Sequence, residues 1–380
     1  MIYLDNAATS YPKPPEVIKA IEKAFYDYGA NPGRSGHDMS VRTADAVYRT
    51  REKINALFNG PGAERVVFTQ NCTSSLNMAI KGCITHGAHV LISSLEHNSV
   101  VRPLETLMQR GEITYTAVNA TGGDDEIVDR FASSFTPKTT VVICTHASNV
   151  SGRIMPVKRI AEITKKHGAL MILDAAQSAG ILDIDFTGWQ LDCLCAPGHK
   201  GLMGPMGTGV LLCTDCIKRT VIEGGTGSSS FNLLQPSELP DMLESGTLNV
   251  PGIIALGSGV DYVTRAGVSN IFAHEYALMS SLREAFSPVE EVIPITSDGN
   301  VNPYVPIYSF NIRDMHSEQV AQALSERGIA VRAGFHCAPL AHMTYKTEHT
   351  GAVRCAPSVF TEKKDIKTLI KCVIEIAKSK

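Results

Sequence analysis

Lys200 is the residue of this chain whose surroundings point most directly to chemistry. A short apolar run, Cys193-Leu-Cys-Ala, ends at Pro197-Gly, and His199 and Lys200 follow. Four glycines then occur within nine residues, which indicates a backbone that turns sharply and approaches another group closely. A lysine on such a turn has three possible roles, which the turn alone leaves open: a solvated charge, a phosphate-binding cation, or a Schiff-base nucleophile.

Polar residues also gather where several predicted strands end. The clusters are Glu96-His97-Asn98, His146-Ala-Ser-Asn149, Asp174-Ala-Ala-Gln177 and Gly198-His199-Lys200. In a parallel sheet the carboxyl ends of the strands meet at one edge, where ligands bind. We therefore expect these four clusters to form one site.

A phosphate cradle is predicted near residue 72. The strand 65–69 is followed by Gln70-Asn-Cys72-Thr73-Ser74 and then by a helical pattern. Free N–H groups and the positive end of a helix bind anions. The alternative is that Thr73 or Ser74 only caps the helix, and the two interpretations are compatible.

Asp174 and Lys200 together suit pyridoxal phosphate. This cofactor needs a lysine for its aldehyde, a carboxylate that keeps its ring nitrogen protonated, and a cradle for its phosphate. His97 could stack on the ring or move protons, although a lone histidine is ambiguous.

The elements that must position these residues alternate between strand and helix. We predict strands at 65–69, 89–93, 113–117, 140–145, 169–173, 191–195 and 209–213, and helices at 16–28, 41–58 and 156–168 and from residue 72. This order is typical of an α/β fold with a mostly parallel sheet covered on both faces. After about residue 255 the pattern becomes α+β, with helices at 251–266, 270–286, 317–327 and 362–378, a strand at 306–312, and an extended segment at 329–333.

Composition excludes several classes of protein. The 380 residues are 44% hydrophobic and 19% charged, with a net charge of −3, so neither disorder nor a basic nucleic-acid or membrane surface is expected. The start, Met1-Ile-Tyr-Leu-Asp5, lacks the features of a signal peptide, and the apolar runs are too short to span a bilayer. We expect a cytoplasmic protein.

The ten cysteines are expected to be thiols rather than disulfides. Two pairs, Cys193-x-Cys195 and Cys213-x-x-Cys216, invite a metal interpretation. Zinc sites usually show two tight C-x-x-C pairs or added histidines, which are missing here, so we favour buried structural thiols and predict no metal. Cys193 and Cys195, two apart in a strand, should point to one face.

The motifs together resemble a known family. Tyr3-Leu-Asp-Asn-Ala-Ala-Thr9, the lysine motif, Glu244-Ser-Gly-Thr-Leu-Asn249, Arg332-Ala-Gly-Phe-His-Cys337-Ala-Pro339 and Arg354 occur in family order. The chain resembles fold-type I pyridoxal-phosphate enzymes of the class V aminotransferase group. Within that group it is similar to the cysteine desulfurases, on the branch with selenocysteine lyase-like members. The resemblance implies a large domain with a mostly parallel seven-stranded sheet (14–255), and a smaller α+β domain (1–13 and 256–380) carrying the active-site cysteine loop.

The resemblance also implies residue roles. Cofactor binding is assigned to Lys200, Asp174 at the ring nitrogen, Gln177 at the ring hydroxyl, His97 on the ring face, Cys72, and Thr73 with His199 at the phosphate. Thr247 matches a residue that reaches the phosphate of a neighbouring subunit, which implies a homodimer. Asn149 and Arg354 match residues that hold the substrate carboxylate, for which an arginine fork is suited.

Cys337 matches the cysteine that removes sulfur. The implied reaction converts L-cysteine to L-alanine and leaves a persulfide on Cys337, with Lys200 and His97 as the other catalytic residues and a sulfur-acceptor protein as a possible partner. His336 or Arg332 could favour the thiolate. The alternatives are selenocysteine lyase, another C–S lyase, an aminotransferase or epimerase, a non-catalytic sulfur carrier, and a nucleotide-binding protein.

Four positions depart from the family pattern. Pro197 stands where a phosphate-binding serine is usual, Leu248 replaces a proline, Met242 replaces an arginine, and Val359-Phe-Thr361 replaces a tyrosine/asparagine-threonine pattern. These departures indicate a divergent subfamily.

Overall fold

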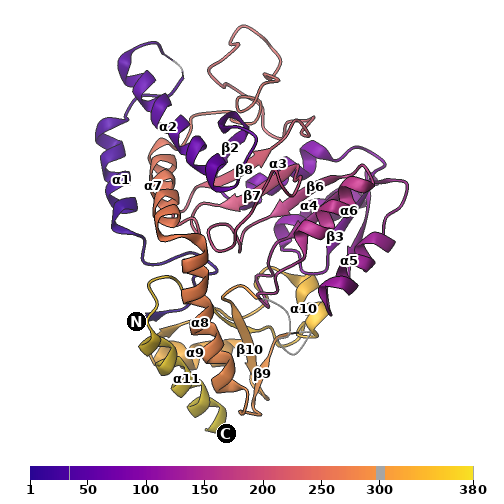
Figure 1. The fold of residues 1–380 in the computed structure, drawn as a ribbon, viewed down its shortest axis with the longest axis vertical. Helices are drawn as coiled ribbons and strands as arrows, with labels where there is room; N and C mark the ends of the chain where they lie inside the picture. Colours follow the sequence, from indigo (N-terminus) through magenta and orange to yellow (C-terminus); the bar gives the residue numbers. More distant parts are fainter. Residues whose placement is uncertain (34, 297–303, 380) are drawn as a thin grey trace.

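The computed structural model describes residues 1–33, 35–296 and 304–379. Figure 1 shows a large part built around a sheet flanked by helices, and a smaller part at the end where both termini lie. Helix α7 (Val250–Ala266) lies in the large part, and α8 (Val268–Phe286) continues into the smaller one.

The large part contains the seven-stranded sheet that the sequence predicted. Its strand order is β2-β8-β7-β6-β5-β3-β4. Strand β8 runs antiparallel to both of its neighbours, and the other neighbouring strands are parallel to each other. The strands are β2 (Val66–Thr69), β3 (His89–Ser93), β4 (Thr114–Val118), β5 (Thr139–Thr145), β6 (Leu170–Asp174), β7 (Cys193–Pro197) and β8 (Gly209–Cys213). The predicted α/β class with a mostly parallel sheet is confirmed.

Alternate residues of each strand enter two separate cores, as the pleat requires. In β2, Val66 and Phe68 face one core while Val67 faces the other. In β7, Cys193 and Cys195 both face the same core, as predicted. Because both faces are covered, the strands are continuous apolar runs rather than alternating ones.

The helices divide between these two cores. Those on the Cys193 side are α3 (Cys72–Cys83) and α4 (Asn98–Gln109). Those on the other side include α2 (Asp38–Leu57), α5 (Asp124–Ser133), α6 (Val157–Lys166) and α7. Helix α1 (Pro15–Asp27) packs against α7, and a short 3₁₀ turn (Ala63–Arg65) precedes β2.

The smaller part is α+β, as predicted. It contains an antiparallel sheet of β9 (Val292–Pro294), β10 (Tyr308–Ile312) and β12 (Val353–Cys355), and a parallel pair of β1 (Ile2–Tyr3) and β11 (Ile329–Ala330). Its helices are α8, α9 (Ser317–Glu326), α10 (Pro339–Tyr345) and α11 (Lys363–Lys378). Three elements of this part were not predicted from the sequence. They are β9 and β12, which have three residues each, and α10, which begins at a proline in the cysteine loop.

The chain division at residue 255 stays a prediction, and α7 runs through that point without a break. The segment assigned to the smaller domain, 256–380, includes 297–303 and 380, which lie outside the described residues. Among the described helices, none combines the length and the apolar character that a bilayer span requires.

Candidate active site

The predicted cofactor residues other than Thr247 surround one cavity of about 200 Å³ at the edge of the sheet. Its wall includes Cys72, Thr73, His97, Asn149, Asp174, Gln177, His199 and Lys200. These side chains come from the ends of β6 and β7, the segment after β5, and the starts of α3 and α4. The four polar clusters therefore meet, as their place after parallel strands predicted.

The Lys200 loop is fixed by close backbone packing. A Cβ on Gly201 would lie 2.3 Å from the carbonyl oxygen of Ala179, and one on Gly180 would lie 2.4 Å from that of Gly201, so only glycine fits at either position. Ser10 adds a hydroxyl that donates to the Lys200 carbonyl at 3.0 Å. The glycine density thus indicates a close approach of two loops.

The amine of Lys200 is poised to lose its proton. Burial, and then the positive charge of Arg354, lower the pKa of Lys200 to about 8. A neutral amine is the nucleophilic form, so this environment favours Schiff-base chemistry over a permanently charged phosphate clamp.

Asp174 ends β6 with its carboxylate in the cavity. Its Oδ1 accepts hydrogen bonds from the Ala176 N–H at 2.8 Å and from the Cys72 thiol at 3.7 Å. Burial raises the pKa of Asp174, while the Ala176 N–H and Lys200 act in the opposite direction. Within the described residues Oδ2 receives no hydrogen bond, so it is free to accept one from a ligand's N–H.

The start of α3 is the segment that the sequence predicted as a phosphate cradle. Asn71 is the N-cap, and its Oδ1 accepts from the Ser74 N–H at 2.9 Å. The suggestion that Thr73 or Ser74 caps the helix was therefore wrong, because α3 begins at Cys72. The N–H groups of Cys72 and Thr73 are in the first turn, between Asn71 and Ser74, and have no intrahelical acceptor, so they can bind an anion.

His97 is the N-cap of α4 and is held in one tautomer. Its Nδ1 accepts from the Ser99 N–H at 3.1 Å, so the proton of the neutral ring is on Nε2. Burial lowers the pKa of His97 to about 4. Ser99, which also lies 2.7 Å from the Thr73 hydroxyl, was missed. The signal that could have identified Ser99 is a polar residue in the first turn of a helix that follows a strand.

His199 and Gln177 complete the wall. His199 lines the cavity, and its Nδ1 is buried and has no hydrogen-bond partner within the described residues. Burial lowers the pKa of His199 to about 4. The Nε2 of Gln177 donates to the carbonyl of Ala7 at 3.1 Å, and this bond fixes its amide against the N-terminal arm.

The cysteine loop is connected to this wall. The Nδ2 of Asn149 donates to the His336 carbonyl at 2.7 Å, and the Asn98 N–H donates to the Cys337 carbonyl at 2.7 Å. His336 and Cys337 have φ values of 48° and 55°, in the left-handed region that non-glycine residues rarely adopt. The Cys337 residue is exposed.

His336 does not supply positive charge to the thiol. Its Nε2 lies 3.0 Å from the Ala352 carbonyl, and burial lowers the pKa of His336 to about 2, so the ring is neutral. That expectation was wrong, because the ring points into the protein while the thiol points out. Arg332 remains the other predicted source of positive charge near the thiol.

Arg354 is buried beside the cavity. Its Nη1 donates to the Asn149 carbonyl at 3.0 Å and its Nη2 to Asp5 Oδ1 at 3.0 Å, while its Nε has no partner within the described chain. Asp5 was not singled out, because a carboxylate in the N-terminal arm gives no sign that it will pair with a residue near the other end of the chain.

Thr247 does not line this cavity. It borders a separate hollow with Ser74 and Gly207. The role predicted for Thr247 is in a neighbouring subunit, so its position within one chain does not test that role. Of the departures, Pro197 lines the cofactor cavity, while Met242 and Leu248 pack against the two cores of the large part.

A match to the model of a known family shows which family this chain belongs to. The model of the family "Aminotransferase class-V" matches residues 2–369. The chain belongs to this family. The class-V match runs through every motif described above, from the N-terminal arm to α11.

Curated relatives of this chain share the name cysteine desulfurase. A "Probable cysteine desulfurase" of Methanothermobacter thermautotrophicus is 33% identical, over 99% of this chain and 94% of that protein. Another "Probable cysteine desulfurase", from Halalkalibacterium halodurans, is 32% identical, over 98% of this chain and 92% of that protein. The apo structure of the cysteine desulfurase from Thermococcus onnurineus NA1 superposes with a TM-score of 0.91 and 29% identity, over 100% of this chain and 95% of that one.

Proposed function

We propose that this protein is a pyridoxal-phosphate-dependent cysteine desulfurase, which converts L-cysteine to L-alanine and places the sulfur on Cys337 as a persulfide. The observation that carries this proposal is the Asn149–His336 hydrogen bond. It connects the cavity of Lys200 and Asp174 to an exposed cysteine whose backbone is held in a rare conformation. An aminotransferase has no use for a thiol at that place.

The residues of the cavity fit pyridoxal phosphate. The N–H groups at the start of α3, with Thr73 and His199, would hold the phosphate. Asp174 Oδ2 would accept from the protonated ring nitrogen, Gln177 would bond the ring hydroxyl, and His97 would lie on the ring. When bound, the cofactor supplies an electron sink for negative charge at the substrate's α-carbon.

Two residues of the chain would hold the substrate's carboxylate. Arg354 keeps unused donors, including its buried Nε–H, and Asn149 has one Nδ2 hydrogen left after its bond to His336. Asp5 fixes the orientation of the guanidinium through Nη2.

Lys200 and Cys337 would carry out the transfer. With its pKa near 8, the Lys200 amine can accept the proton from the substrate's α-carbon and return it. The Cys337 thiolate attacks the substrate sulfur, so an S–S bond forms as the carbon–sulfur bond breaks. The electron pair of the broken bond stays with the substrate carbon, which is protonated to give alanine.

A homodimer is part of this proposal. The segment 214–249, which contains Thr247, forms the loop that projects from the end of the molecule opposite the termini (Figure 1). Phe231 and Leu233 on this loop are fully exposed, at 102% and 100%. Exposed apolar side chains in one segment support a covering partner, and a second copy would bring its Thr247 with it.

The proposal is tested by incubating the protein, loaded with pyridoxal phosphate, with L-cysteine and a reductant. Equal amounts of alanine and sulfide are expected. Pyruvate in place of alanine would indicate β-elimination and contradict the proposal. Parallel assays with selenocysteine and cystine define the substrate.

A further inference from the structure

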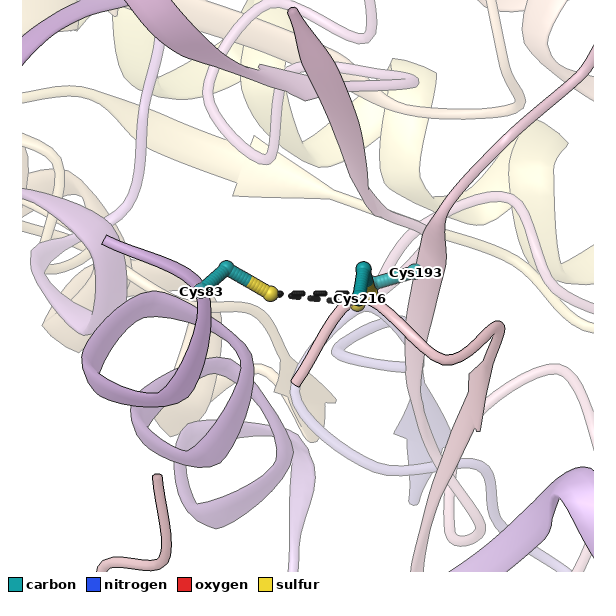
Figure 2. Close-up of side chains that lie close together, drawn as sticks. All are labelled: Cys83, Cys193 and Cys216. Carbon is teal, nitrogen blue, oxygen red and sulfur yellow. Dashed lines mark hydrogen bonds between the residues drawn. The ribbon is translucent and has the colours of Figure 1, made fainter. Parts of the chain in front are cut away.

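Three cysteines that are far apart in the sequence meet at the other end of the sheet. Cys83 ends α3, Cys193 starts β7, and Cys216 follows β8. Their sulfur atoms lie 4.0 Å (Cys83–Cys193), 3.6 Å (Cys83–Cys216) and 3.4 Å (Cys193–Cys216) apart. Figure 2 shows the Cys83 side chain extending from the end of its helix toward the other two. We call these residues the thiol cluster.

We propose that the thiol cluster is a binding site for a thiophilic metal ion, Zn²⁺, in which Cys83, Cys193 and Cys216 are the three protein ligands. The site is separate from the cofactor cavity. Helix α3 has 12 residues, so its ends are roughly 18 Å apart, and the cavity is at its first residue while the cluster is at its last.

The spacing of the sulfurs matches a zinc site. The point equidistant from all three lies about 2.1 Å from each sulfur, and a zinc–sulfur bond is about 2.3 Å. An ion bound at that distance sits slightly to one side of the plane of the sulfurs, as in a tetrahedral site. The fourth position is then open to water. All three ligand atoms are sulfur, which favours soft metal ions over Mg²⁺ or Ca²⁺.

The backbone holds the cluster together. A Cβ on Gly82 would lie 2.9 Å from the Arg219 carbonyl, so this glycine permits the helix end to approach the segment that carries Cys216. The Lys218 N–H donates to the Gly82 carbonyl at 2.9 Å. These contacts are made by the backbone of the chain itself, so they hold Cys83 and Cys216 near each other.

The charge near the cluster and its access to solvent also suit a metal ion. Three thiolates around Zn²⁺ leave one negative charge, and Arg219 donates a hydrogen bond to the carbonyl of Ile84, the residue after Cys83, so a positive charge is nearby. Cys83 and Cys216 keep 7% and 8% exposure, whereas Cys193 has none. An ion can therefore arrive from the Cys83–Cys216 side, displacing the three thiol protons into solvent.

The test uses full-length protein loaded with pyridoxal phosphate, in a Cys337→Ala background that removes the exposed active-site thiol. Zn²⁺ is titrated against a chromophoric chelator, with a phosphine reductant that keeps the cysteines as thiols. One tightly bound ion per chain is expected. Cys83→Ala, Cys193→Ala and Cys216→Ala should each weaken binding by more than about 100-fold, since even outer-shell partners of a metal are worth 10–100-fold.

Cys195→Ala is the matched control. Cys195 is buried on the same strand and the same face as Cys193, but it is not one of the three clustered sulfurs, so its removal should leave affinity unchanged. Equal affinity in Cys195→Ala and Cys216→Ala, or no ion bound to the parent, would overturn the proposal. Circular dichroism checks that each variant is folded.

X-ray absorption at the zinc edge keeps the proposal testable if the variants do not fold. The parent protein with one equivalent of Zn²⁺ should show three sulfur neighbours at about 2.3 Å. A shell of only nitrogen and oxygen would contradict the assignment, as would a Cys193–Cys216 disulfide that persists in reductant.

Discussion

Asn149 Nδ2 donates to the carbonyl oxygen of His336 at 2.7 Å, and Arg354 Nη1 donates to the carbonyl of the same asparagine at 3.0 Å. One residue therefore joins the cavity wall, the cysteine loop and the buried arginine. Left-handed backbone at non-glycine residues persists only where surrounding contacts enforce it. The Asn149 bond is one of the contacts that enforce it at His336 and Cys337.

Asn149→Ala is expected to slow persulfide formation on Cys337. The His336 carbonyl would lose its partner, which costs about 1–3 kcal/mol, or roughly 5–150-fold in the population of the correct loop conformation. Mass spectrometry of the Cys337 peptide after a short exposure to cysteine measures this. The absorbance of bound cofactor should persist. An unchanged rate of persulfide formation would show that the bond does not position the loop.

Lys200 should capture the cofactor with a pH dependence set by its lowered pKa. Only the neutral amine reacts, so the capture rate should rise with pH and level off above about 8. Stopped-flow absorbance on protein freed of cofactor measures this, with Lys200→Ala as the control that never forms the Lys200-dependent band. A rate still rising toward pH 10.5, the ordinary lysine value, would contradict the buried environment.

Arg354→Lys is expected to raise KM for cysteine by about 10-fold or more, with a smaller change in kcat. A lysine is a point charge that cannot keep the bonds to Asn149 and Asp5 and also bind a carboxylate. Steady-state alanine production gives both constants. A fall in kcat alone would assign Arg354 a role other than carboxylate binding.

The buried Arg51–Glu244 pair should stabilise the fold and the base of the loop that carries Thr247. Both Arg51 nitrogens contact Glu244, at 2.8 and 2.6 Å, and the Phe68 N–H donates to the same carboxylate at 2.6 Å. Arg51→Met leaves a buried carboxylate unpaired and should cost about 3–5 kcal/mol in denaturant unfolding.

The exposed pair of Arg159 and Asp125 is the control for that measurement. Arg159→Met should change stability by less than about 1 kcal/mol, because exposed ion pairs contribute little. Similar losses in both variants would refute the distinction between the buried and exposed pairs.

The sequence predicted the large part of this fold well because its signals are local. Strands such as Leu170–Asp174 are short apolar runs, and their ends place Asp174 and Lys200 at one edge of the sheet. Strands of three residues, such as β9 and β12, have too few positions to show the alternation of apolar and polar residues that identifies a strand.

Contacts between residues that are far apart in the sequence could not be predicted from local patterns and spacing. The cysteines were grouped by spacing as Cys193/Cys195 and Cys213/Cys216, whereas the fold joins one thiol of each pair to Cys83. The contacts of Asp5 with Arg354 and of Asn149 with His336 likewise depend on how the N-terminal arm and the smaller part pack against the sheet.

In the proposed reaction, Cys337 receives the sulfur atom of the substrate cysteine. The direct measurement is mass spectrometry of the cofactor-loaded protein after one equivalent of L-cysteine without reductant, with alanine quantified in the same sample. One added sulfur atom is expected on the Cys337 peptide, together with an equal amount of alanine, and neither product is expected in Cys337→Ala. Alanine formation that continues in Cys337→Ala, or sulfur found on another cysteine, would contradict it.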